Sequence, residues 1–310
     1  MLSRIAESLF WIGRYVERAD DTSRILDVQT QLLVEDPGID ETASCTQLLS
    51  VMGVEDYEGT ANRRAIMRVL ATDPDSPTSM VASLAAARES ARRARETLST
   101  DMWEAINTTW RAIGSGRVRT MRPPALFAWV RERSSVIAGI ADSTMSRDEG
   151  WQFLILGRSI ERVDMTARLL STAALSDGPK VAWPTTLRAA GAYEAFLRTY
   201  RGLEADRDAA EFLLLDRLFP RSVVYALTRA ERSLENLASN GGSRAGFDDE
   251  SLRLLGRARA ELEYRPLADV VFDLPVEMER LQRSCSNATD AITHRYFSTE
   301  TPMSWLGGAR

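Results

Sequence analysis

One stretch of the chain occurs twice, as Gly13-Arg14-Tyr15-Val16-Glu17-Arg18-Ala19-Asp20-Asp21-Thr22-Ser23-Arg24-Ile25-Leu26 and as Gly157-Arg158-Ser159-Ile160-Glu161-Arg162-Val163-Asp164-Met165-Thr166-Ala167-Arg168-Leu169-Leu170. The offset is 144 residues at both ends (13 to 157 and 26 to 170), and eight of the fourteen positions are identical. Unrelated helices rarely agree so closely, so the repeat indicates a tandem duplication. Its most faithful part is a set of charges: arginine, glutamate, arginine, aspartate and arginine.

The composition is that of a soluble globular protein. The 310 residues are 44% hydrophobic and 27% charged, enough for one large or two ordinary domains. A net charge of −5 makes nucleic acid or an anionic membrane an unlikely partner. Cys45 and Cys285 are too far apart in sequence for a disulfide framework, and neither a signal peptide nor a run of about 18 apolar residues is present. We therefore expect a cytoplasmic protein.

Apolar residues recur at helical spacing along the chain. Ile5, Leu9, Ile12 and Val16 predict one long helix over about 2–34, which Pro37-Gly38 ends. A capping box at Ser146-Arg147-Asp148-Glu149 is expected to begin the helix of the second unit, which runs to about 175. The remaining helices are predicted at about 42–52, 60–71, 78–113, 125–144, 186–201, 206–218, 222–238, 252–264 and 275–297.

The predicted fold is all-α, because no alternating strand pattern of useful length occurs. We expect a helical bundle of two tandem pseudo-repeats with roughly five helices each, at 1–146 and 147–297, packed as one domain. The tail at 298–310 is expected to be irregular.

The repeated charges form a stripe apart from the apolar face of the first helix. Glu17 lies between Arg14 and Arg18, so one carboxylate could bind both guanidiniums. A solvated ladder of such pairs would contribute only ~0.2 to 0.5 kcal/mol per pair. Phe10 and Ile25 lie on the same stripe, however, which indicates that the charges face protein or a closed cleft. Two alternatives follow, a structural ion network or a binding site.

The candidate binding residues are Arg14, Glu17, Arg18, Arg24, Arg158, Glu161, Arg162 and Arg168. Arginine exceeds acid in the second copy, which suits a carboxylate or phosphate ligand. Glu17 and Glu161 are the candidate catalytic bases, although a carboxylate fixed between two arginines is normally a poor base.

The residue inventory excludes several chemistries. His294 is the one histidine, so di-iron sites built from Glu-x-x-His pairs and the common zinc motifs are excluded. No glycine-rich phosphate loop is present either. We expect neither a metal nor a cofactor.

The opening Leu2-Ser3-Arg4-Ile5-Ala6-Glu7-Ser8-Leu9-Phe10-Trp11-Ile12-Gly13-Arg14-Tyr15-Val16-Glu17-Arg18-Ala19-Asp20 closely resembles the bacterial alpha-E family, a helical domain with a conserved ER motif. Glu17-Arg18 and Glu161-Arg162 occupy the ER positions. The resemblance implies a context in which such proteins accompany an ATP-grasp amide or peptide ligase and a transglutaminase-like peptidase.

From this resemblance we expect a helical accessory protein that works with an ATP-grasp-type ligase, with a transglutaminase-like protein as a further possible partner. Arg14, Arg18, Arg158 and Arg162 would hold a carboxylate. The alternatives are a stand-alone enzyme that uses the Glu/Arg clusters and a purely structural scaffold with buried ion networks.

Overall fold

The computed structural model describes residues 1–174, 182–200, 206–238 and 249–297, and these residues form helices and no strands. The prediction of an all-α fold is confirmed. Six α-helices lie before residue 147 and eight after it in the described part of the chain, where about five had been expected in each unit. The first six are α1 (Ser3–Glu35), α2 (Glu41–Val51), α3 (Arg63–Ile66), α4 (Met80–Arg93), α5 (Thr100–Gly114) and α6 (Pro123–Thr144). The others are α7 (Glu149–Ala174), α8 (Ala182–Ala189), α9 (Tyr193–Tyr200), α10 (Asp206–Leu215), α11 (Val223–Ala238), α12 (Glu250–Tyr264), α13 (Leu267–Phe272) and α14 (Leu274–Ile292).

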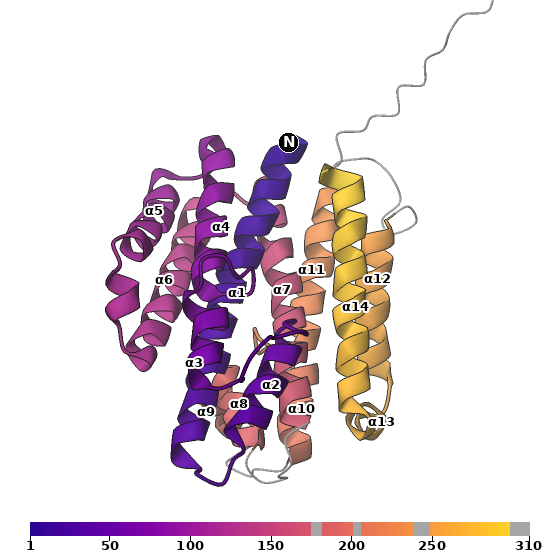
Figure 1. Cartoon of the computed structure of the whole chain (residues 1–310). Coiled ribbons are helices and arrows are strands. Elements are labelled where there is room, and N and C mark those ends of the chain that lie inside the picture. The colour runs from indigo at the N-terminus through magenta and orange to yellow at the C-terminus, as the bar shows by residue number, and fades with distance from the viewer. Residues whose placement is uncertain (175–181, 201–205, 239–248, 298–310) are drawn as a thin grey trace, which may run out of the picture.

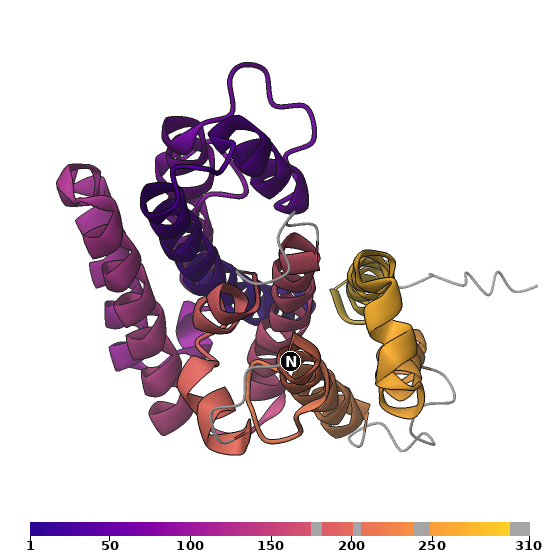
Figure 2. The same cartoon turned by 90° about the horizontal axis from the view of Figure 1, so that it is seen from below.

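The two helices that carry the repeated stretch, α1 and α7, pack against each other at the centre of the bundle. Helices α4 and α6 pack on α1, while α11 and α14 pack on α7. Figure 1 shows α5 and α6 on one flank of this centre and α12 and α14 on the other, and Figure 2 shows the same arrangement from below. Because α1 and α7 have neighbours on several sides, several of their charged residues are buried along with the apolar ones, among them Arg14, Glu17, Glu161 and Arg162.

Two glycines allow the backbones of α1 and α7 to touch. A Cβ atom on Gly13 would lie 2.1 Å from the carbonyl oxygen of Leu154, and one on Gly157 would lie 2.0 Å from that of Phe10. Neither position has room for a side chain. The contact is reciprocal, because Phe10 and Leu154 are themselves 144 residues apart.

The predicted helix at 78–113 is wrong, because the chain breaks there into α4 and α5. Helix α4 ends at Arg93, a single 3₁₀ turn follows at Arg95–Thr97, and Ser99 caps α5 by accepting a hydrogen bond from the Met102 amide at 3.1 Å. Serine is a strong N-cap residue, and this local signal overrides the high helix propensity of the segment. The turn lets α5 pack back against α4.

Two other local predictions need correction. The predicted helix at 186–201 is divided into α8 and α9 at Gly191, whose φ of 63° lies in the left-handed region that favours glycine. At the start of α7 the side chain that accepts the bond is Asp148 and not Ser146: Asp148 Oδ1 accepts from the Trp151 amide at 3.2 Å. The tail at 298–310, which is predicted to be irregular, lies outside the described residues.

The helices that follow α1 and α7 begin in the same way. Ser79 caps α4 and donates a hydrogen bond to the carbonyl of Asp73, while Ser222 precedes α11 and donates to the carbonyl of Asp216. Both serines and both aspartates are 143 residues apart. None of the helices in the described part of the chain is long and apolar enough to cross a lipid bilayer.

Candidate functional site

Glu17 of α1 is bound by arginines of α7. Arg162 Nε donates a hydrogen bond to Glu17 Oε1 at 2.6 Å, and Arg158 Nε lies 3.3 Å from Glu17 Oε2. Arg162 also donates to the carbonyl oxygen of Pro220, at 3.1 Å. The Glu17 side chain is only 5% exposed.

Glu161 of α7 is bound by arginines of α1 in return. Arg14 Nε donates to Glu161 Oε2 at 2.6 Å and Arg18 Nε donates to Oε1 at 2.5 Å. Arg14 makes a second hydrogen bond, to the Thr289 hydroxyl of α14 at 2.9 Å. Every charged group of this cluster therefore has a close partner, and Glu161 is completely buried.

The sequence-based expectation that Glu17 binds Arg14 and Arg18 of its own helix is wrong. Glu17 and Glu161 lie four residues, about one helical turn, beyond the glycine contact of α1 with α7. At that distance from the contact each glutamate reaches the arginines of the opposite helix. The partners are exchanged between helices because the glycines bring the two backbones so close.

The arginines lower the pKa of both glutamates. Burial alone would raise the pKa of Glu17, but Arg162, Arg221 and Arg158 together hold it well below its ordinary value. Burial would likewise raise the pKa of Glu161, but Arg18 and Arg14 outweigh this effect and lower the pKa to about 2. Both glutamates are therefore ionised over the physiological pH range.

Arg221, which directly precedes Ser222 at the start of α11, is a site residue that the sequence analysis missed. Its guanidinium donates to Asp20 and Asp21 and lies 3.2 Å from Glu17 Oε1. At an offset of 143 its counterpart is Thr78, so the repeat pattern carries no sign of this arginine.

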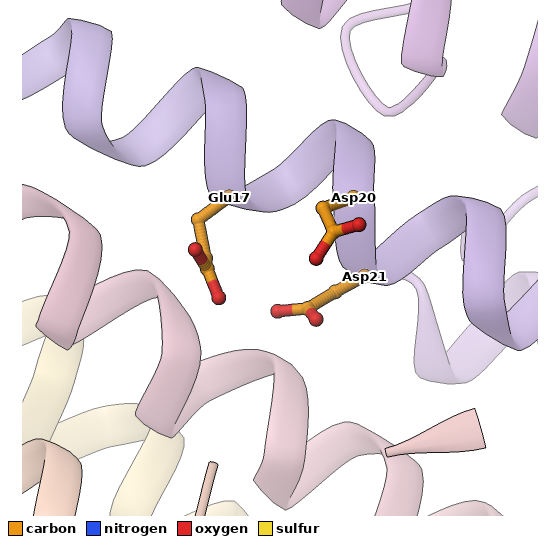
Figure 3. A group of neighbouring side chains, drawn as sticks. All are labelled: Glu17, Asp20 and Asp21. Atoms are coloured by element: carbon orange, nitrogen blue, oxygen red, sulfur yellow. The ribbon is translucent and has the colours of Figure 1, made fainter. Parts of the chain in front are cut away.

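Figure 3 shows Glu17, Asp20 and Asp21 pointing to the same side of α1. One carboxylate oxygen from each lies within 4.8 Å of the others. Arg221 supplies the positive charge that such an acidic group attracts, so the group needs no metal ion to be neutralised. Burial raises the pKa of Asp21 to about 7, against the opposing effect of Arg221.

Each of the two remaining predicted arginines forms an ion pair with an aspartate four residues earlier in its own helix. Arg24 Nε donates to Asp20 Oδ2 at 3.2 Å, and Arg168 Nε donates to Asp164 Oδ2 at 2.8 Å. Arg168 also donates to the carbonyl oxygen of Val51, which ties α7 to the end of α2. Arg24 and Arg168 are thus held in the same way at the same position of the repeat.

A pocket opens beside Glu17, and Glu161 is not among the residues that line it. Its volume is about 90 Å³, enough for a few water molecules or a small ligand. Four arginines and two carboxylates line it, namely Arg24, Arg158, Arg162, Arg221, Glu17 and Asp20. The rest of the wall is mostly apolar and comes largely from α6 and α7, including Ile137, Ala138, Ala141, Trp151, Leu154 and Ile155. We call this space the Arg158 pocket.

Four of the eight predicted binding residues line the Arg158 pocket, namely Glu17, Arg24, Arg158 and Arg162. Arg14, Arg18, Glu161 and Arg168 do not. The pocket also contains Asp20, Ser134 and Arg221, which were not among the candidates. Asp20 belongs to the repeated charges and could have been included on that ground, whereas nothing in the sequence distinguishes Ser134.

Among the predicted site residues, Arg158 differs in that its guanidinium donates no hydrogen bond to the described part of the chain. No residue in the described part of the chain accepts a hydrogen bond from its guanidinium, and the 3.3 Å contact with Glu17 lacks hydrogen-bond geometry. Its side chain is 34% exposed, compared with 10% for Arg14 at the equivalent repeat position. Burial, Arg162 and Arg221 lower the pKa of Arg158.

Two further features lie outside the pocket. Arg88 on α4 is not merely solvated, because its guanidinium lies 4.5 Å from the ring centre of Trp110 and 5.7 Å from that of Trp103. His294 is exposed in the π-helical turn Thr293–Phe297 that follows α14, far along the chain from the repeated charges.

Comparison with known proteins places this arrangement in a family. The family model Alpha-E, described as a predicted alpha-helical domain with a conserved ER motif, matches residues 1–297. Uncharacterised proteins of Mycobacterium bovis and Mycobacterium tuberculosis are 28% identical over 343 aligned residues. The alignment covers 98% of this chain but only 38% of each relative, so the chain spans well under half of their length. No solved structure matches the chain significantly.

Proposed function

The chain belongs to the Alpha-E family, and from this membership and the geometry of its charges we propose that it is a helical accessory protein that binds a carboxylate-bearing ligand in the Arg158 pocket. The two copies of the ER motif have different roles in this proposal. The Glu161 cluster holds the bundle together, and the Glu17 cluster holds the ligand. The halves 1–146 and 147–297 are tandem repeats packed as one domain about their shared α1 and α7 contact.

The guanidinium of Arg158 carries the proposal. Buried polar groups in proteins are almost always hydrogen-bonded, and a buried donor without an acceptor is costly. Arg158 Nε is buried and makes an ion pair with Glu17, but it has no hydrogen-bond partner among the described residues, and the residue lines a cavity. A ligand that accepts its hydrogen bonds would remove this cost.

The charge balance of the pocket favours an anion. Four guanidiniums against two carboxylates leave an excess of positive charge in the lining. Arg162 and Arg221 are already engaged with Glu17, Asp20 and Asp21, and Arg24 is engaged with Asp20. Arg158 is therefore the group that remains for the ligand, and the planar fork of a guanidinium matches a carboxylate well.

Glu17 and Glu161 act in this proposal as fixed counter-charges and not as bases. A general base works best when its pKa is near the operating pH, whereas the arginines lower the pKa of both glutamates. This argues against the alternative of a stand-alone enzyme that uses either glutamate. The purely structural alternative fits the Glu161 cluster but leaves the unpaired Arg158 unexplained.

The proposed partner is an ATP-grasp-type amide or peptide ligase in the cytoplasm, with a transglutaminase-like protein in the same system. Support for this part comes from the resemblance of the opening sequence to components of such systems. A carboxylate is the group that an amide ligase activates with ATP, so a carboxylate-binding helical protein suits that role.

The binding proposal can be tested by titrating the protein with sodium propionate. The indole NMR signal of Trp151 reports on the pocket, because Trp151 is part of its wall. We expect this signal to shift and saturate in the wild type and to stay unchanged in Arg158→Gln. Arg92→Gln removes the same charge from an exposed position on α4 and should behave as the wild type. If the Trp151 indole signal of the wild type does not shift when propionate is added, the proposal is overturned.

The partner is tested separately with an ATP-grasp-type ligase from the same organism. We expect it to co-purify with the wild-type protein and to hydrolyse ATP faster in its presence, while Arg158→Gln should bind the ligase without stimulating it. The absence of both effects would leave a carboxylate-binding protein with another partner.

A further inference from the structure

Three residues that line the Arg158 pocket each have a buried side-chain atom with no hydrogen-bond partner among the described residues. These atoms are Arg158 Nε, Asp20 Oδ1 and Ser134 Oγ. The first is a cationic donor, the second an anionic acceptor, and the third a hydroxyl that can both donate and accept. A simple carboxylate would satisfy the first and would leave the second unpaired.

Only one of the two carboxylate oxygens of Asp20 accepts hydrogen bonds from the described residues. Asp20 Oδ2 accepts hydrogen bonds from Arg24 and Arg221, while Oδ1 accepts none from the described residues. Asp20 is only 5% exposed, so this oxygen is not simply solvated. A buried carboxylate oxygen without a donor is costly, and an ammonium group that donates to it could recover this cost.

Asp20 and Arg158 are close enough for one small molecule to contact both. Glu17 is near both residues: one of its carboxylate oxygens lies within 4.8 Å of one carboxylate oxygen of Asp20, and Glu17 Oε2 is 3.3 Å from Arg158 Nε. The two atoms that lack a hydrogen bond among the described residues belong to groups of opposite charge. Their natural ligand therefore carries a negative and a positive group a few ångströms apart.

The walls set the size and character of the rest of the ligand. Ile137, Ala138 and Ala141 of α6 form an apolar surface on the same side as Ser134, and Leu154 and Ile155 of α7 extend it. A cavity of about 90 Å³ has room for a short apolar group and not for a long chain.

We propose that the Arg158 pocket binds a free α-amino acid with a small apolar side chain, with its carboxylate on Arg158, its ammonium on Asp20 Oδ1 and its side chain against α6. The Ser134 hydroxyl donates to the carboxylate in this arrangement. The inference rests on the proposed function, because it assumes the carboxylate site and adds the ammonium contact and the size limit.

A divalent cation is the competing occupant of the acidic side of the pocket, because Glu17, Asp20 and Asp21 lie close together. Arg221 contacts all three carboxylates and occupies the position such an ion would take. An ammonium group needs only the free oxygen of Asp20, so it can bind while Arg221 stays in place.

The experiment compares L-alanine with two molecules that each lack one of its charges. Propionate lacks the ammonium group and ethylamine lacks the carboxylate; all three are titrated against the Trp151 indole signal. We expect L-alanine to bind at least about tenfold more tightly than propionate and ethylamine to cause no shift. Asp20→Asn should remove the preference for L-alanine over propionate, because the amide oxygen can still accept from Arg24 and Arg221 but the side chain no longer offers an anionic oxygen to the ammonium group.

The outcomes separate the inference from the proposed function. Equal affinity for L-alanine and propionate in the wild type would overturn the ammonium contact while the carboxylate site stands. If neither molecule shifts the signal, the proposed function fails as well. Broadening of the Trp151 signal by Mn²⁺ at concentrations that displace L-alanine would assign the acidic side to a cation instead. The comparison of the three ligands on the wild-type protein decides the question even if Asp20→Asn does not fold.

Discussion

Arg14 and Arg158 occupy the same position of the repeated stretch but have different surroundings. Arg14 is bonded to Glu161 and to the Thr289 hydroxyl that α14 supplies. On the other side of the α1 and α7 contact, α6 supplies Ser134, whose hydroxyl is unpaired. The same residue type therefore makes a structural ion pair in one copy and is the proposed ligand-binding group in the other.

This difference predicts unequal effects of removing the two charges. Arg14→Gln should lower the free energy of unfolding by roughly 3 kcal/mol, because it breaks a buried, hydrogen-bonded pair. Arg158→Gln should change it by less than about 1 kcal/mol, because no hydrogen bond is lost. Urea unfolding followed by circular dichroism measures both. Equal losses would show that Arg158 is as structural as Arg14.

The raised pKa of Asp21 predicts that the folded protein becomes less stable as the pH rises. Its pKa is raised from 3.8 to about 7 in the folded protein, so its contribution is fully present below pH 3.8 and is lost as the pH rises through about 7. At 1.36 kcal/mol per pH unit the full effect is about 4 kcal/mol. Glu17 and Glu161 act in the opposite direction, because their pKa values are lowered, and they contribute above about pH 4.5.

The measurement is the melting temperature of the wild type and of Asp21→Asn between pH 5 and pH 8. The wild type should lose stability over this range, and the variant, which cannot ionise at this position, should lose less. Parallel curves would mean that Asp21 is ionised throughout.

At the scale of the elements, the contact between α1 and α7 determines where every charge of the site lies. Gly13 and Gly157 leave the helix backbones in direct contact, and the glutamates one turn further on face the opposite helix. Trp151, Leu154 and Arg158 recur at spacings of three and four along α7, which puts them on one face toward the pocket.

Alanine at either glycine should therefore be strongly destabilising. The added Cβ would lie about 2 Å from a carbonyl oxygen, so the helices must separate, at a cost of about 3 kcal/mol or more. Gly139→Ala on α6 is the matched control, since its Cβ meets nothing within 4 Å and alanine should gain roughly 0.5 to 1 kcal/mol there. Thermal unfolding of the three variants compares them directly. Similar melting temperatures would refute the role of the glycine contact.

At the scale of the whole molecule, the exchanged ion pairs join the two halves. The glutamate of each half is neutralised by arginines of the other, so neither half alone can satisfy its own buried charge. Helix α14 adds to this, because its Thr289 binds Arg14 of the first half.

We therefore expect segments 1–146 and 147–297 to associate when they are produced together as separate chains. They should co-purify in a 1:1 complex on size-exclusion chromatography, and each should be poorly folded alone. Gly157→Leu in the second segment should prevent the association, because it blocks the helix contact. Two independently folded monomers would contradict a shared core.

The sequence by itself determined the helical class, the central helices α1 and α7, and the identity of the repeated charges. These are local properties, since periodicity and capping act within a few residues and the repeat can be read directly. The signals for the breaks at Ser99 and Gly191 are also local, but the sequence prediction gave more weight to the helix propensity of their neighbours and ran one helix through each break.

Only the tertiary structure decided which charges meet. Within one helix Glu17 had Arg14 and Arg18 as neighbours, and no local rule could reveal that a glycine contact would place Arg162 and Arg158 closer. No local rule could reveal that Arg221, which follows α10 in the chain, reaches the site, or that Arg158 makes no hydrogen bond with the described residues. Partner choice depends on distances between elements far apart in the chain, and those distances are fixed by packing and not by the local sequence.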